Sequence, residues 1–361
     1  MKKKIVLGIS MMLTASLMAG CKSNLSNENS PNSNVKTETT TEQNEIQNQE
    51  QDKTEQQIKT GFAVVTKLND SKEAGNENGQ AVANSLAAAV TLDEDGVITK
   101  CVIDAVQSKA DFTKEGTLAT DKNTVFSTKN ELGETYGMKS ASAIGKEWNE
   151  QAKAFADYVV GKTVEEVNGI AVKEGKAADD DLLASVTIHI GDFKTVVEKA
   201  VQNASNLGAK TGDRLGLAIN TSMASSSDAT KDQDGVVQID SSYTVTTVDE
   251  NGVITSCYID GSQAKVGFDK KGTITTDIEN EVLTKDELGE TYGMKSASSI
   301  GKEWNEQAKA FADYVVGKTA EEVNGIAMKE GKAADNDLLA SVTIHIGNFI
   351  TDVVKSVESA E

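Results

Sequence analysis

The residues best suited to chemistry occur in pairs, one in each of two copies of the same segment. Each copy has the sequence Asp-Leu-Leu-Ala-Ser-Val-Thr, followed by Ile-His. The carboxylates, hydroxyls and imidazoles of the two copies are Asp181, Ser185, Thr187 and His189, and then Asp337, Ser341, Thr343 and His345. A Ser-His-Asp arrangement could be assembled from them, but no nucleophile-elbow sequence accompanies it. Because the set is duplicated, each half of the chain is expected to carry its own site.

Other common sites have little basis in the sequence. There is no CxxC, HExxH or clustered His/Cys motif, so a zinc site is not expected. No glycine-rich phosphate loop of the Walker or Rossmann kind occurs. The segments 93–96 and 249–252 invite a calcium interpretation, but the rest of a twelve-residue calcium loop is missing, and turn chemistry accounts for them better. Cys101 and Cys257 lie in strand-like runs and are expected to be buried free thiols.

The two copies belong to a longer duplication. Residues 131–193 return at 287–349, and only five of the 63 paired positions differ. The sequence upstream of this stretch has drifted much further between the copies. One unit was therefore duplicated, and its second half has been held almost fixed.

Residues 1–20 have the pattern of a bacterial lipoprotein signal peptide. Three lysines precede an apolar run of about the length of a secretory h-region, too short for a comfortable membrane span. The run ends Leu-Met-Ala-Gly before Cys21, which resembles a lipobox. Cys21 is therefore expected to be lipidated and to hold the protein on the extracellular face of the cell membrane. A signal peptide without lipidation is the alternative.

Three further regions follow from composition. Residues 21–59 are rich in Asn, Glu, Gln, Thr and Ser and lack aromatic residues, which predicts a disordered tether. Two domains are expected after it, at 60–205 and 206–361, each long enough for its own core. The net charge of −20 argues against nucleic acid as a partner. It also argues against adhesion to an anionic membrane surface, so the anchor is expected to be lipid.

Each unit shows helix and strand patterns without βαβ regularity, so the expected class is α+β. In the first unit, strands are expected at 62–66, 83–92, 97–104 and 185–190, the second and third forming a hairpin across the turn 93–96. A helix capped by Ser142 is expected to bury Ile144, Trp148, Phe155 and Val159 and to end near Gly161. Thr163 is expected to open a short helix through a capping box, and 192–201 to form the last helix.

Three features, in the same order in both repeats, resemble the FMN-binding domains of the sodium-pumping quinone reductase and Rnf complexes. The first is the hairpin, Ala-Ala-Ala-Val-Thr-Leu-Asp-Glu-Asp-Gly-Val-Ile-Thr-Lys-Cys-Val-Ile-Asp in the first copy. The second is Glu-Thr-Tyr-Gly-Met, which is similar to the family's E-T-P-G-L loop. The third is Asp-Leu-Leu-Ala-Ser-Val-Thr, which resembles in spacing the D-x-x-S-G-A-T motif. In that motif, a flavin transferase esterifies the last threonine with the phosphate of FMN.

The doubled unit on a lipoprotein tether closely resembles the extracellular electron-transfer flavolipoproteins of Gram-positive bacteria. The resemblance implies two small, mostly antiparallel sheets with packed helices, each holding one FMN. It implies a redox carrier rather than a turnover enzyme, which passes electrons from the membrane electron-transfer chain to extracellular acceptors. The residues implied in cofactor binding are Asp181, Ser185, Thr187, Asp337, Ser341 and Thr343, with Glu134, Thr135, Tyr136, Gly137, Met138, Glu290, Thr291, Tyr292, Gly293 and Met294.

The sequence also departs from these families. Ala-Ser-Val-Thr replaces Ser-Gly-Ala-Thr, and His189 and His345 stand where a second Ser or Thr is usual. Tyr136 and Met138 could pack on a flavin ring or on the core. Two alternatives therefore stay open: a lipoprotein that binds flavin or another small ligand non-covalently, and a cofactor-free interaction module.

Overall fold

The computed structural model describes residues 56–361, and these residues belong to one compact unit. The predicted signal peptide, the lipidation of Cys21 and nearly all of the predicted tether lie outside the described residues. The fold begins slightly before the expected boundary at residue 60. Ile58 is already buried, and its backbone N–H donates to the carbonyl of Ala209.

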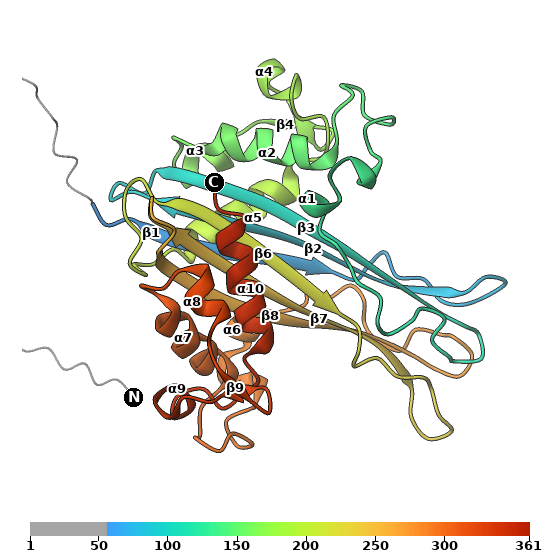
Figure 1. Ribbon diagram of the computed structural model, residues 1–361. Coiled ribbons are helices and arrows are strands. Elements are labelled where there is room, and N and C mark those ends of the chain that lie inside the picture. Colours follow the sequence, from blue (N-terminus) through green and yellow to red (C-terminus); the bar gives the residue numbers. More distant parts are fainter. Residues whose placement is uncertain (1–55) are drawn as a thin grey trace, which may run out of the picture. The chain divides into compact units, whose positions relative to one another are not determined.

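Each repeat contains a three-stranded antiparallel sheet whose strands follow chain order (Figure 1). The first sheet comprises β1 (Lys59–Lys67), β2 (Gly79–Leu92) and β3 (Ile98–Phe112). The second comprises β6 (Arg214–Ser222), β7 (Gly235–Val248) and β8 (Ile254–Phe268). The predicted hairpin is confirmed, because β2 and β3 pair antiparallel. In its turn, Asp93 accepts hydrogen bonds from the backbone N–H groups of Asp95 and Val97. The strands extend well beyond the predicted segments.

The two sheets pack against each other through small residues. Along β2, Ala81, Ala83, Ala87 and Ala89 belong to the two hydrophobic clusters that contain residues of both repeats. The alternate residues of the strand belong instead to the cluster under the first repeat's helices. Phe112 and Phe268 stack across the shared interface with ring centroids 4.4 Å apart. Because alternate side chains of a strand point to opposite faces, each sheet has one face toward its own helices and one toward the other repeat.

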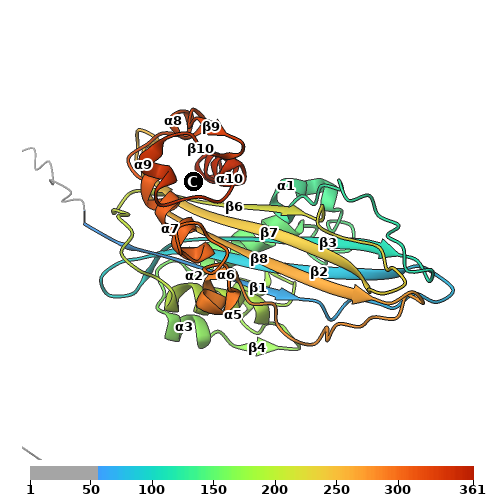
Figure 2. The same ribbon diagram turned by 90° about the horizontal axis from the view of Figure 1, so that it is seen from below.

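The helices lie on the outer faces of the paired sheets, as Figures 1 and 2 show from two directions. In the first repeat they are α1 (Lys129–Leu132), η1 (Gly133–Tyr136), α2 (Trp148–Val159), α3 (Val164–Asn168), α4 (Asp180–Leu183) and α5 (Gly191–Gln202). In the second they are α6 (Lys285–Leu288), η2 (Gly289–Tyr292), α7 (Trp304–Val315), α8 (Ala320–Asn324), α9 (Asn336–Leu339) and α10 (Gly347–Glu358). The class is therefore α+β.

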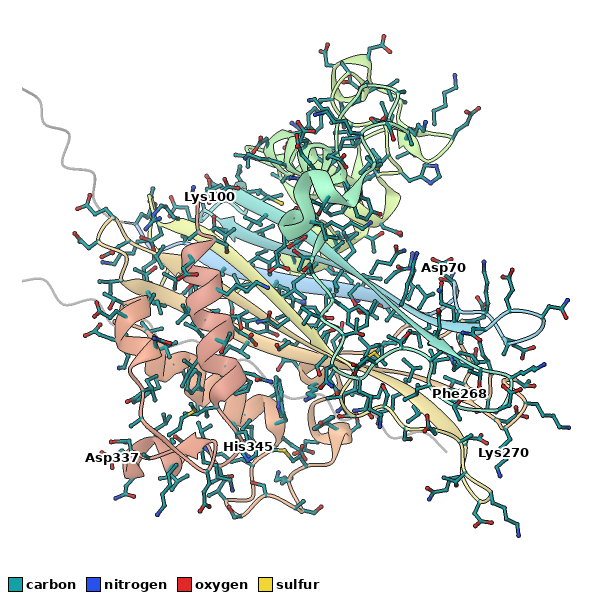
Figure 3. The ribbon with its side chains drawn as sticks, turned by 45° about the vertical axis from the view of Figure 1, so that its right-hand side comes forward. Asp70, Lys100, Phe268, Lys270, Asp337 and His345 are labelled. Carbon is teal, nitrogen blue, oxygen red and sulfur yellow. The ribbon has the colours of Figure 1, made fainter. Side chains whose placement is uncertain are left out.

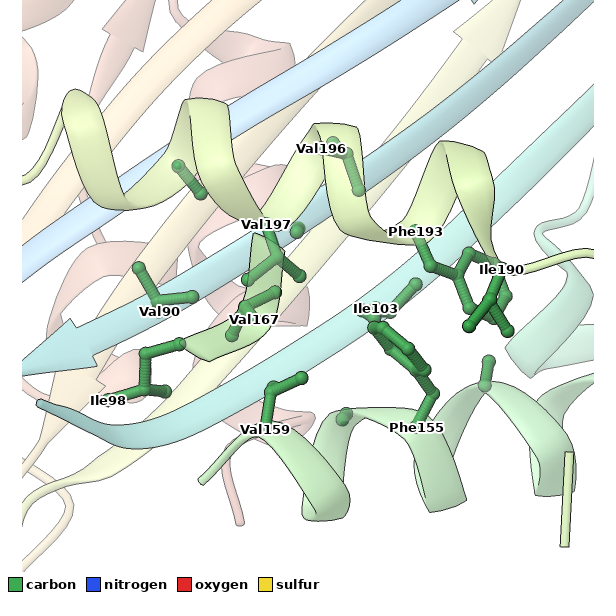
Figure 4. Packing of buried hydrophobic residues seen from close by; sticks show 14 of the residues in the cluster. Val90, Ile98, Ile103, Phe155, Val159, Val167, Ile190, Phe193, Val196 and Val197 are labelled. Atoms are coloured by element: carbon green, nitrogen blue, oxygen red, sulfur yellow. The ribbon is translucent and has the colours of Figure 1, made fainter. Parts of the chain in front are cut away.

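Helices α2 and α5 bury one apolar side each against the sheet, and Figure 4 shows these side chains meeting. Phe155 and Val159 project from α2, and Phe193 and Val196 project from α5. The predicted face of α2 is confirmed for Trp148, Phe155 and Val159. Its predicted start is wrong: the helix begins after Glu147, so Ser142 does not cap it and Ile144 lies outside it. Thr163 does open α3 with the predicted capping box.

The predicted strand at 185–190 is wrong. The structure instead has the small hairpin β4 (Val172–Lys173) and β5 (Lys176–Ala177), then α4, and then an irregular segment leading into α5. The second repeat has the same arrangement, with β9 (Met328–Lys329) and β10 (Lys332–Ala333). In the first repeat, the buried side chain of Gln151 accepts backbone hydrogen bonds from this segment that a neighbouring strand would otherwise accept.

Replacing Gly61 by Ala is expected to destabilise the protein by about 1–3 kcal/mol, because added volume at a tight contact forces the backbone to shift. A Cβ at this position of β1 would lie 2.1 Å from the carbonyl oxygen of Ala200 in α5. The control is Gly75→Ala, where a Cβ would meet nothing within 4 Å. Urea denaturation of the two variants measures the difference. Equal stability would show that α5 does not pack this closely on β1.

Both cysteines in the folded unit are free thiols: Cys257 is buried, as expected, whereas Cys101 is only partly covered. Burial raises the pKa of the Cys101 thiol to about 12, so the reactive thiolate form is disfavoured. Within residues 56–361, no helix is long and apolar enough to cross a membrane.

Candidate functional site

Each repeat has a cleft at the same place, between its sheet, the start of its first long helix and the segment that leads into its last helix. The first cleft, of about 470 Å³, is lined by all three strands of its sheet together with Lys129, Trp148, Ile188 and His189. The second cleft, of about 710 Å³, has the equivalent residues Lys285, Trp304, Ile344 and His345. These volumes are in the range of small-molecule sites. The duplicated sequence therefore produces a duplicated cleft.

A lysine and a tryptophan ring line each cleft, and a tyrosine ring packs near the same lysine. The Lys129 ammonium lies 4.7 Å from the ring centroid of Trp148 and 4.8 Å from that of Tyr136. In the second repeat, the Lys285 ammonium lies 4.4 Å from the ring centroid of Trp304 and 5.1 Å from that of Tyr292. Burial lowers the pKa of Lys285, while the neighbouring carboxylates of Asp240 and Asp260 oppose this. The contacts fix a cation beside an aromatic surface.

The predicted threonine lies at the edge of each cleft and is held by a buried glutamine. The Gln151 side-chain oxygen accepts hydrogen bonds from the Thr187 backbone N–H at 2.8 Å and its hydroxyl at 3.2 Å. It also accepts one from the Ile188 N–H at 3.2 Å. Gln151 is wholly buried, whereas Thr187 is half-buried.

Gln307 holds Thr343 through the same three bonds, at 2.8, 3.2 and 3.3 Å. Thr343 lines its cleft directly. In the first repeat, the lining includes the two residues after Thr187 rather than Thr187 itself.

The Glu-Thr-Tyr-Gly-Met motifs lie behind the wall of each cleft rather than in its lining. Tyr136 and Met138 pack against the hydrophobic core of the first repeat, and Tyr292 and Met294 against that of the second. Buried Glu147 accepts hydrogen bonds from the backbone N–H groups of Met138 and Lys139. The motif therefore positions the tyrosine that contacts the cleft lysine.

The other motif residues have local roles. The Thr135 and Thr291 hydroxyls donate to the carbonyls of Leu132 and Leu288. Gly137 and Gly293 adopt the left-handed conformation that ends the turn, with φ of 79° and 80°. Exposed Glu134 and Glu290 form ion pairs with Lys139 and Lys295, which contribute little to stability at the surface.

The remaining predicted residues lie beside the threonine without reaching it. The Ser185 and Ser341 hydroxyls donate to the carbonyls of Leu182 and Leu338. Asp181 and Asp337 are exposed in α4 and α9, and the preceding Asp179 and Asp335 cap these helices instead. Figure 3 labels Asp337 and His345 in the helical part of the second repeat. Each histidine ring lies close against the glycine of a small hairpin, Gly175 or Gly331.

The last helix of each repeat begins beside the threonine segment. In the first repeat, the Lys67 ammonium and the Asp192 carboxylate form an ion pair at 2.7 Å at the start of α5. The second repeat has Ser222 and Asn348 at the equivalent positions, so this ion pair is absent there. A helix N-terminus and a lysine favour an anion, whereas Asp192 opposes one. The N-terminus of α10, where Asn348 replaces the aspartate, therefore suits a phosphate better than the N-terminus of α5.

One wall of the second cleft is more polar than its counterpart. Asp352 of α10 and Asn220 of β6 stand where the first repeat has Val196 and Val65. The Asp352 carboxylate accepts a hydrogen bond from the Asn220 amide. The second carboxylate oxygen of Asp352 is buried without a partner of good geometry among residues 56–361. Burial raises the pKa of Asp352, and the nearby Ser242 hydroxyl opposes this rise. The two clefts are thus equivalent in position but not in polarity.

The residues that sequence reasoning missed are Gln151, Glu147 and Lys129, with their counterparts in the second repeat. Gln151 and Glu147 lie within the nearly unchanged stretch, which was the available signal. Both lie in the stretch from Ser142 to Gly161 that was expected to form a helix, and no role was predicted for either of them. Neither pattern nor spacing indicated that they face the threonine segment and the Glu-Thr-Tyr-Gly-Met motif.

Comparison with known proteins gives one partial match. No protein-family model matches the chain, and no solved structure matches it significantly. The chain is similar to a chlorophenol reductase of Desulfitobacterium hafniense, with 32% identity over 119 residues. The matched region is 30% of this chain and 35% of that protein, so the chain spans little more than a third of the length of this curated relative.

Proposed function

We propose that this protein is a lipid-anchored extracellular electron carrier that holds one FMN in each cleft, esterified through its phosphate to Thr187 and Thr343. The observation that carries the proposal is the repeated threonine, which a buried glutamine fixes at the edge of an equivalent cleft in both repeats. A flavin transferase would attach the cofactor. The membrane electron-transfer chain and extracellular acceptors would be its redox partners.

The residues of the clefts suit such a cofactor. The tryptophan and the lysine beside it offer an aromatic surface and a positive charge to a flat, polar ring system. In the second repeat, Thr343 and Asn348 at the start of α10 line the same cleft, so a phosphoester there would lie near a helix N-terminus. When bound, FMN would supply the reversible uptake of electrons. The chain's own residues would hold it, exclude water from one face and balance its charge.

The partial relative supports redox chemistry in general terms. Its name describes a reductase that acts on chlorophenol, and reduction requires the transfer of electrons. A redox role for this chain agrees with that kind of chemistry. The substrate named for the relative is not carried over, because the match covers only part of either chain.

Thr187→Ala and Thr343→Ala are each expected to remove one FMN from a protein that otherwise carries two, because the alanine has no hydroxyl to esterify. The test is intact mass and a visible spectrum of the full-length chain, co-produced with a flavin transferase and purified in detergent. The double variant should be colourless and of unmodified mass. Thr195→Ala, at an exposed threonine of α5, serves as the matched control.

Three other outcomes would contradict the proposal. A coloured protein of unmodified mass would favour non-covalent flavin binding. A colourless wild type, produced with a transferase shown active on another substrate, would favour an interaction module. Loss of both adducts in a single variant would show that the two sites are not independent.

A further inference from the structure

The hydrogen bonds around Gln151 determine how its amide is oriented. Two backbone N–H groups, those of Thr187 and Ile188, point to one atom of the side chain, and only the amide oxygen can accept them. The amide nitrogen accordingly donates to the Ser142 hydroxyl and to the carbonyl of Lys146, each at 3.2 Å. The orientation of this amide therefore follows from its partners.

The same geometry fixes the Thr187 hydroxyl. Its oxygen lies 3.2 Å from the Gln151 amide oxygen, which carries no hydrogen. The hydroxyl must therefore be the donor in this bond, and its lone pairs point away from the glutamine. Thr187 is half-buried, so part of its side chain is accessible to an approaching group.

We infer that Gln151 and Gln307 are positioning residues for the covalent modification of Thr187 and Thr343. The inference rests on the proposed function and names the device that presents each threonine to the transferase. The glutamine turns the hydroxyl hydrogen inward and keeps the nucleophilic lone pairs outward. It also holds the backbone on both sides of the threonine in an irregular conformation that no neighbouring strand supports.

The chemical step balances with a flavin dinucleotide as co-reactant. The threonine oxygen forms a bond to the phosphorus that carries riboflavin, and the pyrophosphate P–O bond breaks. The second nucleotide leaves as its monophosphate, and the hydroxyl proton is released to a base of the transferase or to water. An amide oxygen is too weak a base to take this proton, so Gln151 orients the hydroxyl without deprotonating it.

Both glutamines also have a structural role, because each accepts hydrogen bonds from two backbone N–H groups. A purely structural residue, however, would affect the two repeats through the stability of the shared unit. A positioning residue affects only the threonine that it contacts. The duplicated site therefore provides an internal control within one molecule.

The experiment is a time course of flavin attachment to purified, unmodified full-length chain incubated with flavin transferase and flavin adenine dinucleotide. Peptide mass analysis reports Thr187 and Thr343 separately. Gln151→Met, which keeps the side-chain volume without the hydrogen bonds, is expected to slow attachment at Thr187 by about tenfold or more and to leave Thr343 unchanged. Gln307→Met is expected to give the reverse result.

Gln151→Glu provides the rescue, because a buried glutamic acid in its protonated form keeps a carbonyl oxygen that can accept the three hydrogen bonds and can donate to the carbonyl of Lys146 in place of the amide. It is expected to restore most of the rate at Thr187. An unchanged rate in Gln151→Met would overturn the inference while leaving the proposed function intact. So would an equal loss at both threonines with a lowered melting temperature and no rescue by Glu. A wild-type chain that accepts no flavin would instead overturn the proposed function, and the inference with it.

Discussion

Replacing both Asp104 and Asp260 by Asn is expected to remove a loss of stability that the wild-type protein undergoes between about pH 4 and pH 6. The two carboxyls occupy equivalent positions in strands β3 and β8, and both are almost fully buried. Burial raises the pKa of each from 3.8 to about 6. Hydrogen bonds from the backbone N–H groups of Ala105 and Asn130 to Asp104 only partly offset this.

The sign follows from proton linkage. Because the folded state binds these protons more tightly than the unfolded state, the stabilisation is complete below the unfolded pKa and is lost as pH rises through the folded pKa. A shift from 3.8 to about 6 corresponds to about 3 kcal/mol for each residue. Asparagine resembles the protonated carboxyl and does not ionise. The double variant should therefore be more stable than wild type at pH 7, and similar to it at pH 4.

Urea denaturation at several pH values between 4 and 7 measures this difference. The comparison is between variant and wild type, because other carboxylates, such as Asp249, have pKa values lowered by hydrogen bonds and change stability in the opposite direction. Asp181→Asn, an exposed residue, controls for the change in net charge. Parallel pH profiles of wild type and the double variant would show that the buried carboxyls stay ionised in the folded state.

Replacing Asn220 and Asp352 together by Val is expected to stabilise the protein without bound cofactor by about 1–3 kcal/mol at neutral pH. Asp352 is buried and Asn220 is half-buried, and one carboxylate oxygen has no partner of good geometry within the described part of the chain. A buried polar pair replaced by apolar groups of similar volume is often neutral or stabilising. The first repeat has valines at both positions, which shows that a cleft of this kind folds with apolar residues there.

The single variants separate the contributions. Asn220→Val leaves the carboxylate without its amide donor and should destabilise the protein, because an uncompensated buried charge is costly. The reciprocal change, Val65→Asn with Val196→Asp, should destabilise the first repeat. Thermal denaturation of these variants provides the measurement. If the double valine variant is less stable than wild type, interactions other than these hydrogen bonds must offset the cost of burying the Asp352 carboxylate.

Local patterns in the sequence determined several elements correctly. Asp93 and Gly96 form the predicted turn because a short carboxylate can accept from nearby backbone N–H groups. Thr163 caps α3 because its hydroxyl and Glu166 satisfy the free N–H groups of the first turn. The helix predicted at 192–201 forms as α5, Gly191–Gln202. In each case the groups that interact are close in the sequence, so spacing alone was sufficient.

The threonine segment shows where local reasoning failed. The apolar alternation from Ser185 to Ile190 is typical of a strand, yet its backbone N–H groups at Thr187 and Ile188 donate to Gln151. That side chain comes from a helix 36 residues earlier, and nothing in the local pattern indicates it. The same applies to Glu147, which was expected within a helix and instead accepts hydrogen bonds from Met138, the last residue of the Glu-Thr-Tyr-Gly-Met motif, and from Lys139, which follows it.

The sequence by itself therefore determined the duplication, the α+β class, the turns and caps, and the threonine as the residue to examine. The tertiary structure decided which residues surround it. Only folding brings Lys129 over the Trp148 ring, places Gln151 against Thr187, and packs the alanine faces of the two sheets into shared clusters. These contacts join side chains that are far apart in the chain, and their geometry depends on the packing of whole sheets and helices rather than on any local spacing.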